Sequence, residues 1–440
     1  MNFKKFFELA KLNGLEAADI EEVREKSLQI SLFKGELISY SVSIDKSFTA
    51  RGIYNGKMGF VAVEKDDAAT LEYIVKTIKE AATISENNDE AIIFKGSPKY
   101  KKKNLYNEEL NKIEAETFIA KLHEIEDKLY AKSDKIKDVE VSFSLSDTSS
   151  VLANSYGLNL KTKNNYFYVV AEIVLSEKEN ETKTAYDIFF DNDFAKFDVD
   201  KYVDELVAKG LAKLGGETIK GGKHKVVLKE NCVANFLSFA ISNANSESVQ
   251  KHSSVFEGKL NQKICSSKIT VEERPLEKNL FYTYFDDEGV ATKNKKVIDK
   301  GVLKTFFYNL ATAKKDGVET TGNARGRGSK MGIGFTNIYL KPGKLSEEEL
   351  FQKVENGVYV TSLAGLHSGL NPVSGDFSLQ AEGFHIKNGK LDKALTLFTL
   401  SGNLFQVFND VIAVGNNLKL LPSSVTVPSM AVKNLKISAE

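Results

Sequence analysis

The chain has 440 residues, of which 42% are hydrophobic and 27% charged, and its 60 basic side chains balance its 60 acidic ones. This length exceeds what one hydrophobic core usually serves, so we expect two or three domains. The balanced charge argues against a nucleic-acid-binding protein, which usually carries a basic excess. Cys232 and Cys265 stand in no paired spacing, which excludes a disulfide scaffold and is consistent with a reducing compartment.

The first residues predict a short amphipathic helix from Met1 to Lys11. A signal peptide is not expected, because the apolar run breaks at Glu8. Elsewhere no apolar run approaches the roughly 20 residues that are needed to span a bilayer. We therefore expect a cytoplasmic protein that makes no contact with a membrane.

An amino-terminal α+β domain is expected over residues 1–90. Alternating apolar residues predict a meander of four strands, at Leu28–Phe33, Leu37–Ile44, Phe48–Tyr54 and Lys57–Val63. Lys34-Gly35 and Asn55-Gly56 are its predicted turns. A helix follows, which Asp66 or Asp67 can cap.

A central α+β domain is expected over residues 108–220. It begins with a helical stripe of apolar residues, namely Phe118, Leu122, Ile125 and Leu129. Strands are predicted at Val139–Leu145, Val151–Ser155, Tyr166–Leu175 and Ala185–Phe190, and a closing helix at 200–214. The pairs Gly215-Gly216 and Gly221-Gly222 then indicate a flexible junction and the clearest domain boundary.

A large β-rich domain is expected over residues 223–440. Turn pairs are frequent there, and two helices are predicted, at 231–244 and 346–355. The second helix begins with a capping box, in which Ser346 precedes Glu349. The predicted fold class is therefore α+β, with amino-terminal α+β units followed by a β-rich barrel or sandwich.

The most distinctive segment of the chain reads Gly-Leu-Asn-Pro-Val-Ser-Gly-Asp-Phe-Ser over residues 369–378. Its Pro, Gly and short polar residues are typical of tight turns. A hairpin follows, with a predicted type I′ turn at Asn388-Gly389. The segment could shape a groove that holds an extended peptide through strand addition. The expected peptide-binding residues are Asn371, Ser374, Gly375, Asp376, Phe377 and Ser378. Alternatively, the segment is an ordinary connection that packs Phe377 inward.

This segment resembles the TldD/PmbA metallopeptidase family, whose PmbA/TldE branch carries Asn-Pro-x-[Ser/Thr]-Gly-Asp-Phe-Ser. Further segments match that family in the same order along nearly the whole chain. They are Ala50-Arg51-Gly52, Ser253–Phe256, Phe285–Val290, Gly322–Arg325 and Phe335–Gly343. Together these matches identify the chain as similar to the PmbA/TldE branch.

The resemblance also implies where a metal would be bound. TldD-type members bind a catalytic metal through His-Glu-x-x-x-His on a helix that corresponds to 231–244 here. The matching positions hold Ser238, Phe239 and Asn243. Ser and Asn are weak neutral ligands and Phe cannot take a proton. A further Cys-Gly ligand segment is also missing, since that region reads Leu420–Met430. We expect no catalytic residue and no metal in this chain, with zinc only in a TldD-like partner.

Histidines elsewhere leave one alternative open. His252 follows the helix at 231–244, while His123 and His385 lie in other predicted elements. The leading hypothesis is a non-catalytic PmbA/TldE-like subunit of a cytosolic TldD/TldE-type system that processes unfolded peptides. The alternatives are a stand-alone homodimeric peptide-binding protein, and a peptidase whose metal ligands come from scattered residues.

Overall fold

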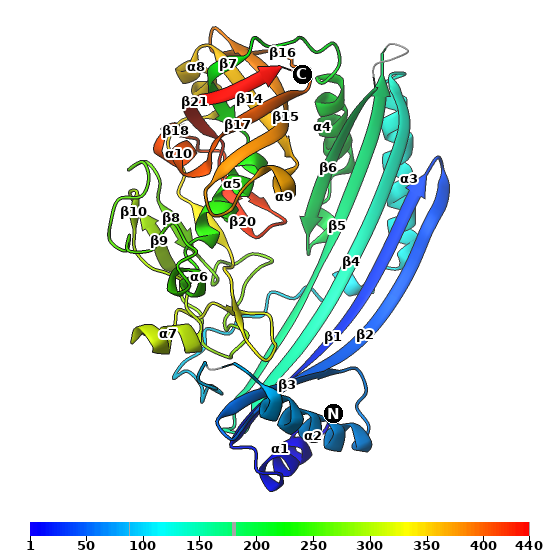
Figure 1. Cartoon of the computed structure of the whole chain (residues 1–440). Coiled ribbons are helices and arrows are strands. Elements are labelled where there is room, and N and C mark those ends of the chain that lie inside the picture. Colours follow the sequence, from blue (N-terminus) through cyan, green and yellow to red (C-terminus); the bar gives the residue numbers. More distant parts are fainter. Residues whose placement is uncertain (88, 178–181, 440) are drawn as a thin grey trace. The chain divides into compact units, whose positions relative to one another are not determined.

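The computed structural model describes residues 1–87, 89–177 and 182–439, and it confirms the α+β class (Figure 1). The chain forms two compact units. The first contains residues 1–214 together with 278–292 and 309–332. The second contains the remaining segments, 215–277, 293–308 and 333 onward. Two stretches from the later part of the sequence therefore pack with the amino-terminal residues.

A six-stranded antiparallel sheet organises the first unit, in the order β3-β2-β1-β4-β5-β6. Its strands are β1 (Ala17–Phe33), β2 (Glu36–Tyr54), β3 (Lys57–Val63), β4 (Ile136–Asn154), β5 (Asn159–Ser176) and β6 (Thr182–Asp191). Because β1 pairs with both β2 and β4, one sheet runs through both predicted amino-terminal domains.

Helices build two separate cores on this sheet. The first core packs α1 (Phe3–Leu12) and α2 (Ala68–Ile84) against β1, β2 and β3. The second packs α3 (Ala115–Lys132) and α4 (Val199–Leu211) against β1, β4 and β5. Further elements of the unit are the 3-10 turns η1 (Leu110–Lys112) and η2 (Phe194–Lys196), α7 (Leu310–Asp316) and the short strand β11 (Ala324–Arg325), which pairs with β12 (Gly332–Ile333).

The predicted turns of the first meander are confirmed. Lys34, Gly35, Asn55 and Gly56 all have positive φ, as tight hairpin turns require. The predicted break between Leu37–Ile44 and Phe48–Tyr54 is wrong. The polar residues between them remain paired with β1, where Lys46 lies opposite Arg24, so β2 is one strand.

The second unit contains a closed barrel, which confirms the predicted β-rich domain. Its ring runs β14-β7-β21-β17-β15, and pairing of β14 with β15 closes it. The strands are β7 (Gly222–Leu228), β14 (Gly357–Ala364), β15 (Asp376–Lys387), β17 (Phe398–Asn403) and β21 (Met430–Ala439), with β16 (Lys390–Ala394) and β18 (Val411–Val414) added. Asn388 and Gly389 have positive φ and confirm the predicted hairpin turn.

A second sheet and five helices complete this unit. The sheet has the order β10-β9-β8-β13-β20-β19. Its strands are β8 (Val271–Glu273), β9 (Lys295–Asp299), β10 (Val302–Leu303), β13 (Ile338–Leu340), β19 (Lys419–Leu421) and β20 (Val425–Val427). The helices are α5 (Glu230–Ser242), α6 (Ser246–Gln250), α8 (Glu347–Val354), α9 (Leu366–Gly369) and α10 (Leu404–Asn409). The predicted capping box of α8 is confirmed. No described helix is long and apolar enough to cross a membrane.

Candidate functional site

The helix that the family resemblance matches to a metal-binding helix of TldD-type members is α5, which directly follows β7. Strand β7 lies in the barrel between β14 and β21, so the start of α5 is held at the end of a buried strand. The helix buries an apolar face that includes Cys232, Phe236 and Ile241. Ser238 and Phe239 are half-buried, and Asn243 at the carboxyl end is buried.

The loop over 371–375 is closed by its own hydrogen bonds. The side chain of Asn371 accepts from the backbone N–H groups of Val373 and Ser374, at 2.9 and 3.0 Å. The backbone of Asn371 also accepts from Gly375 N–H at 2.8 Å. Asn403 on β17 donates to Ser374 O and to Asp376 Oδ1, both at 2.9 Å. These bonds give the loop one conformation tied to β17.

The carboxyl end of α5 and this loop come together, although they lie far apart in the sequence. The side-chain amide of Asn243 donates to Pro372 O at 3.2 Å. The rings of Phe236 and Phe377 pack with centroids 4.9 Å apart. Asn243, one of the three positions matched to the metal motif, therefore contacts the distinctive loop, and we call α5 together with this loop the helix–loop site.

The helix–loop site does not fit a catalytic metal. Ser238, Phe239 and Asn243 offer no imidazole, thiolate or carboxylate, and these are the groups that bind zinc. The amide of Asn243 is already committed, because it donates to both Phe239 O and Pro372 O at 3.2 Å. Over the described ranges of the chain, no group of three or more His, Cys, Asp or Glu side chains could hold a metal ion.

The histidines considered in the sequence have other surroundings. His252 is exposed, and its Nδ1 lies 2.6 Å from Oε1 of Glu257. His224 places Nε2 2.9 Å from Lys220 O. His385 lies on β15, where burial lowers its pKa. The scattered-ligand alternative thus has no cluster to support it among the residues that the structure describes.

The six expected peptide-binding residues divide into two groups. Asn371, Ser374, Asp376 and Ser378 are exposed, whereas Gly375 and Phe377 are buried. Strand addition requires a free strand edge. Phe377 offers no free edge, because it pairs with Gly402 of β17 on one side and bridges to Leu370 on the other. The exposed side chains of the segment remain accessible, and its contact with a peptide stays a prediction.

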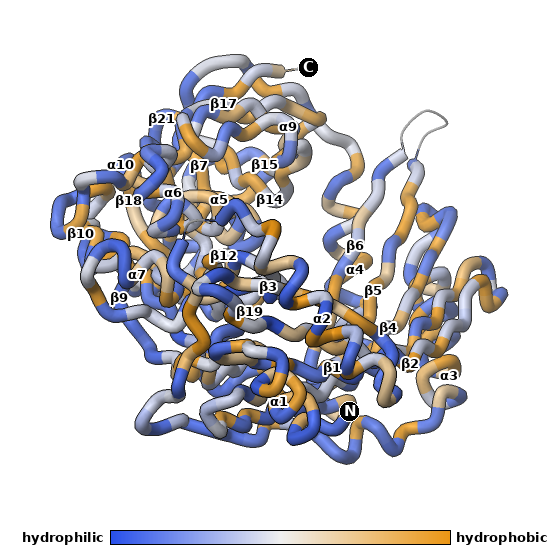
Figure 2. The backbone as a smooth tube through the Cα atoms, turned by 60° about the horizontal axis from the view of Figure 1, so that its bottom comes forward, coloured by the Kyte–Doolittle hydropathy of each residue, from blue (hydrophilic) through white to orange (hydrophobic). Residues whose placement is uncertain are grey.

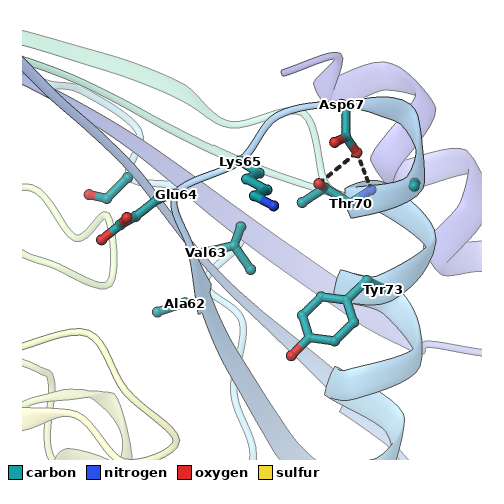
Figure 3. A pocket seen from close by; sticks show the side chains of 9 residues that line it. Ala62, Val63, Glu64, Lys65, Asp67, Thr70 and Tyr73 are labelled. Atoms are coloured by element: carbon teal, nitrogen blue, oxygen red, sulfur yellow. Dashed lines mark hydrogen bonds between the residues drawn. The ribbon is translucent and has the colours of Figure 1, made fainter.

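An open pocket of about 650 Å³ lies in the first unit, at the start of α2 (Figure 3). Its lining includes Val63, Lys65 and Tyr73. Figure 3 shows Asp67 turned toward Thr70, whose backbone N–H it accepts at 2.8 Å. This bond confirms Asp67 as the cap of the helix. Because the carboxylate already satisfies the helix end, we read the pocket as a surface hollow.

A buried group of charged residues in the first unit is a second feature that the sequence reasoning did not identify. Asp19 on β1 is bonded by two guanidinium groups, with Arg51 Nε at 3.2 Å and Arg327 Nη2 at 2.5 Å. Burial alone would raise the pKa of Asp19, but Arg327 and Arg51 outweigh it, so the pKa is lowered. Asp286 and Glu288 are also buried, and both interact electrostatically with Arg51. We call these five residues the charged cluster: Asp19, Arg51, Asp286, Glu288 and Arg327.

The two carboxyl groups Asp286 and Glu288 differ in their hydrogen bonds. Asp286 accepts three backbone N–H bonds at 2.9–3.0 Å, from Glu288, Val290 and Ala324, and these favour its charged form. Glu288 accepts one, from Leu310 at 2.9 Å. Burial and the neighbouring Asp286 raise the pKa of Glu288 to about 8. We therefore assign the proton of this coupled pair to Glu288 at neutral pH.

The raised pKa of Glu288 gives the first unit a pH-dependent stability. The folded protein holds a proton that the unfolded chain releases near the ordinary pKa of a glutamate, 4.5, so the free energy of unfolding should fall as pH rises from about 4.5 to about 8. Glu288→Gln, which stays neutral, should lessen this fall by at least about 1 kcal/mol, the equivalent of one pKa unit. Urea unfolding at several pH values measures it, with exposed Glu319→Gln as the control. Equal pH slopes in wild type and Glu288→Gln would contradict the assignment.

Comparison with known proteins shows which family this chain belongs to. Profiles of three domains match: PmbA/TldA metallopeptidase domain 1 at residues 18–85, the central domain at 108–214 and the C-terminal domain at 221–439. The chain belongs to the PmbA/TldD family. A metalloprotease PmbA homologue of Buchnera aphidicola is 25% identical, over 88% of each chain. A zinc metalloprotease TldD homologue of Saccharolobus solfataricus is also 25% identical, over 92% of this chain and 90% of the relative.

Solved structures of other proteins have the same fold. TldE of Thermococcus kodakarensis superimposes with a TM-score of 0.90 at 22% identity, covering 99% of each chain. A protein of Thermotoga maritima superimposes with a TM-score of 0.91 at 25% identity, also over 99% of each chain. These likenesses extend over both compact units.

Three of the segments that resemble the PmbA/TldD family contain residues of the charged cluster or a residue bonded to it. Arg51 belongs to the first, Asp286 and Glu288 to the second, and Ala324, which donates to Asp286, to the third. The sequence contained one signal for this cluster: Asp19 and Arg51 lie on strands among apolar residues. Charged side chains in such places are buried only when they are paired, so the two residues could have been predicted to have charged partners.

Proposed function

We propose that this chain is a non-catalytic, TldE-like subunit of a TldD/TldE-type metallopeptidase system that acts on unfolded or extended peptides. In this proposal a TldD-like chain holds the zinc and the general base. The observation that carries the proposal is the chemistry of α5, which has Ser238, Phe239 and Asn243 at the positions that the family resemblance assigns to the metal motif.

The chemistry of these positions supports a non-catalytic role. Metallopeptidases use a metal-bound water that a neighbouring carboxylate deprotonates. The benzyl side chain of Phe239 cannot take a proton, and the side-chain amide of Asn243 fixes the loop through Pro372. In this proposal, the end of α5 that would hold a metal in TldD-type members instead positions the loop over residues 371–375.

The loop is the part of the site that we propose contacts the peptide. Its exposed polar side chains, Asn371, Ser374, Asp376 and Ser378, would donate to or accept from the backbone of an extended chain. Gly375 and Phe377 would hold the loop in place from beneath. The names of the relatives agree with the proposal, since they include a TldE, a PmbA homologue and a TldD homologue.

Co-expression with a TldD-like chain tests the proposal. The two chains should purify as one complex that contains stoichiometric zinc and cleaves an unfolded, labelled polypeptide in a chelator-sensitive manner. The chain alone should bind no stoichiometric zinc and cleave nothing. In the complex, Ser378→Arg should weaken peptide binding without lowering the melting temperature, because Ser378 is exposed. Ser267→Arg, at another exposed serine of the same unit, is the matched control.

Three results would count against this function. Chelator-sensitive cleavage by the chain alone, with bound zinc, would establish a peptidase with its own metal. Peptide binding by a homodimer that ignores every TldD-like chain would establish a stand-alone binding protein. Unchanged affinity of the Ser378→Arg complex, at an unchanged melting temperature, would remove the loop from the peptide site.

A further inference from the structure

Helices α1 to α4 all pack on one face of the six-stranded sheet. On β1, Leu28 and Ile30 belong to the core that α3 and α4 cover, and Ile20 belongs to the core that α1 and α2 cover. Successive side chains of a strand point to opposite faces, so residues 27, 29 and 31 lie on the other face. Figure 2 shows the hydropathy alternating along β2, β4 and β5, as expected when the two faces of the sheet differ.

Backbone pairing arranges the side chains of that other face in rows across five strands. Ser41 of β2 lies opposite Gln29 of β1, which lies opposite Ser144 of β4. The same row continues to Tyr168 of β5 and Phe190 of β6. We call this central row and its two neighbouring rows the open face, which consists of Ser39, Ser31, Ser142, Val170, Ile188, Ser41, Gln29, Ser144, Tyr168, Phe190, Ser43, Ser27, Ser146 and Tyr166. All of these residues are exposed or half-buried, and none is charged.

Hydroxyl groups of the open face are available to a ligand. Within the described residues, the side-chain hydroxyls that form no hydrogen bond with the protein include those of Ser31, Ser142, Ser144, Tyr166 and Tyr168. A hydroxyl can donate or accept, so these groups can meet both the N–H and the C=O groups of an extended backbone. Beside them, the ring of Tyr168 stacks on that of Phe190 with centroids 5.8 Å apart and meets that of Tyr166 edge-on at 5.4 Å. This aromatic strip can contact apolar or cationic side chains.

Two pairs of like-charged residues lie at the ends of the open face. Glu25 is directly opposite Asp45 at one end, and Glu140 is directly opposite Glu172 at the other. All four side chains are exposed, and in the part of the chain that the structure describes none of them forms an ion pair. Like charges directly opposite each other destabilise a sheet. A cationic ligand would remove this repulsion at both ends.

We propose that the open face binds an extended, unfolded polypeptide segment that carries basic side chains near both of its ends. The two acidic pairs are eight residues apart along β1, from Glu25 to Phe33, which lies opposite Glu140. At about 3.3 Å per residue this separation is roughly 26 Å, the length of an extended peptide of about eight residues. Lysine or arginine side chains at the ends of the peptide would meet the two carboxylate pairs. Its middle would lie on the hydroxyl groups and the aromatic strip.

Charge complementarity favours such a peptide over other occupants. The four carboxylates would repel a nucleic acid or an acidic peptide. An apolar partner would bury the hydroxyl groups without hydrogen bonds, which costs free energy. The choice of a peptide rests on the proposed function, since a metallopeptidase system for unfolded peptides must hold its substrate in an extended form. The open face lies in the first unit and the helix–loop site in the second, so each can be tested separately.

Fluorescence anisotropy of the full chain with two matched, labelled peptides tests the charge preference. The cationic peptide has a pair of lysines at each end and only Gly, Ser and Tyr between them, and the acidic peptide has glutamates in place of the lysines. The cationic peptide should bind about tenfold more tightly. Glu140→Gln/Glu172→Gln should weaken its binding about fivefold without lowering the melting temperature, because the repulsion at this end is removed. Glu8→Gln/Glu72→Gln, at exposed positions of α1 and α2, is the matched control and should change neither.

A substitution in the central row tests where the peptide lies. Gln29→Arg should weaken binding of the cationic peptide about tenfold at an unchanged melting temperature, because Gln29 is exposed and the new charge repels the lysines. Thr117→Arg, at an exposed position of α3, should bind the peptide as the wild type does. Ser378→Arg, in the loop of the helix–loop site, should also retain this binding.

Three results would overturn the inference. Equal affinities of the wild type for the two peptides would remove the charge complementarity. Unchanged affinity of Gln29→Arg, or a loss of binding in Ser378→Arg alone, would place the peptide elsewhere. A dimer that Gln29→Arg converts to a monomer, while neither peptide binds, would assign the open face to a second copy of the chain. Peptide binding at the open face by a chain that forms no active complex would support this inference and count against the proposed function.

Discussion

Replacing Arg327 with alanine should lower the free energy of unfolding of the first unit by about 3–5 kcal/mol, as expected when one partner of a buried ion pair is removed. The guanidinium of Arg327 is 4% exposed, donates three hydrogen bonds and forms an ion pair with Glu21 at 3.4 Å. It donates to Asp19 Oδ1 at 2.5 Å, to Thr49 Oγ1 at 2.9 Å and to Asp287 O at 2.8 Å. Alanine would leave the buried carboxylate of Asp19 with Arg51 alone.

The effect should be largest for alanine and smaller for lysine. Arg327→Lys retains the charge, but its ammonium cannot reach three acceptors with the planar geometry of a guanidinium. Urea unfolding measures the difference. Lys112→Ala is the control, because Lys112 is 66% exposed and pairs with Glu109, which is 77% exposed, and such surface pairs are worth less than about 1 kcal/mol. An Arg327→Ala protein as stable as Lys112→Ala would show that the charged cluster does not hold the unit together.

Gly375→Ala should lower the free energy of unfolding of the second unit by about 2–4 kcal/mol, from positive-φ strain and from overpacking. Gly375 has φ +79°, and an added Cβ would lie 2.6 Å from Cδ2 of Phe405. The Phe405 ring cannot move freely, since it packs against Phe256 with centroids 6.0 Å apart. The substitution should therefore displace the loop that Asn243 contacts.

Substitution of a second glycine, Gly365, separates the effect of backbone strain from the effect of overpacking. Gly365 has φ +78°, but the nearest atom to its added Cβ is Ser368 Oγ at 4.0 Å. Gly365→Ala therefore has the backbone strain without the collision and should cost about 1 kcal/mol. Urea unfolding of both variants gives the comparison. Equal losses would mean that the ring of Phe405 yields and that the loop is not held from beneath.

The local elements of this protein follow closely from the sequence. Asp67 caps α2, Ser346 and Glu349 form the capping box of α8, and Asn388-Gly389 makes the predicted turn. Each depends on a few neighbouring residues whose preferences need no distant partner. The break predicted within β2 failed for the opposite reason. Asp45 and Lys46 stay in a strand because β1 pairs with them, which propensity cannot anticipate.

The sequence identified the two parts of the helix–loop site but not the contact between them. The distinctive loop and the substituted motif at Ser238, Phe239 and Asn243 were both identified, each as a separate segment. Their contact, through Asn243 and Pro372, joins residues 129 positions apart. The bridge between Leu370 and Phe377, which occupies one edge of the predicted peptide-binding segment, was not predicted either. Pairing of distant backbone segments depends on the closed barrel and leaves no local pattern.

By itself, the sequence determined the α+β class, the family resemblance, the capped helices, the tight turns and the presence of Ser238, Phe239 and Asn243 at the positions that the resemblance assigns to the metal motif. These follow from side-chain chemistry and short-range backbone preference. The tertiary structure alone decided that one sheet runs through both predicted amino-terminal domains, and that residues 278–292 and 309–332 pack with them. It also decided that Asp19, Arg51 and Arg327 meet. The physical reason is that burial of a charge depends on partners that only the folded chain brings within reach.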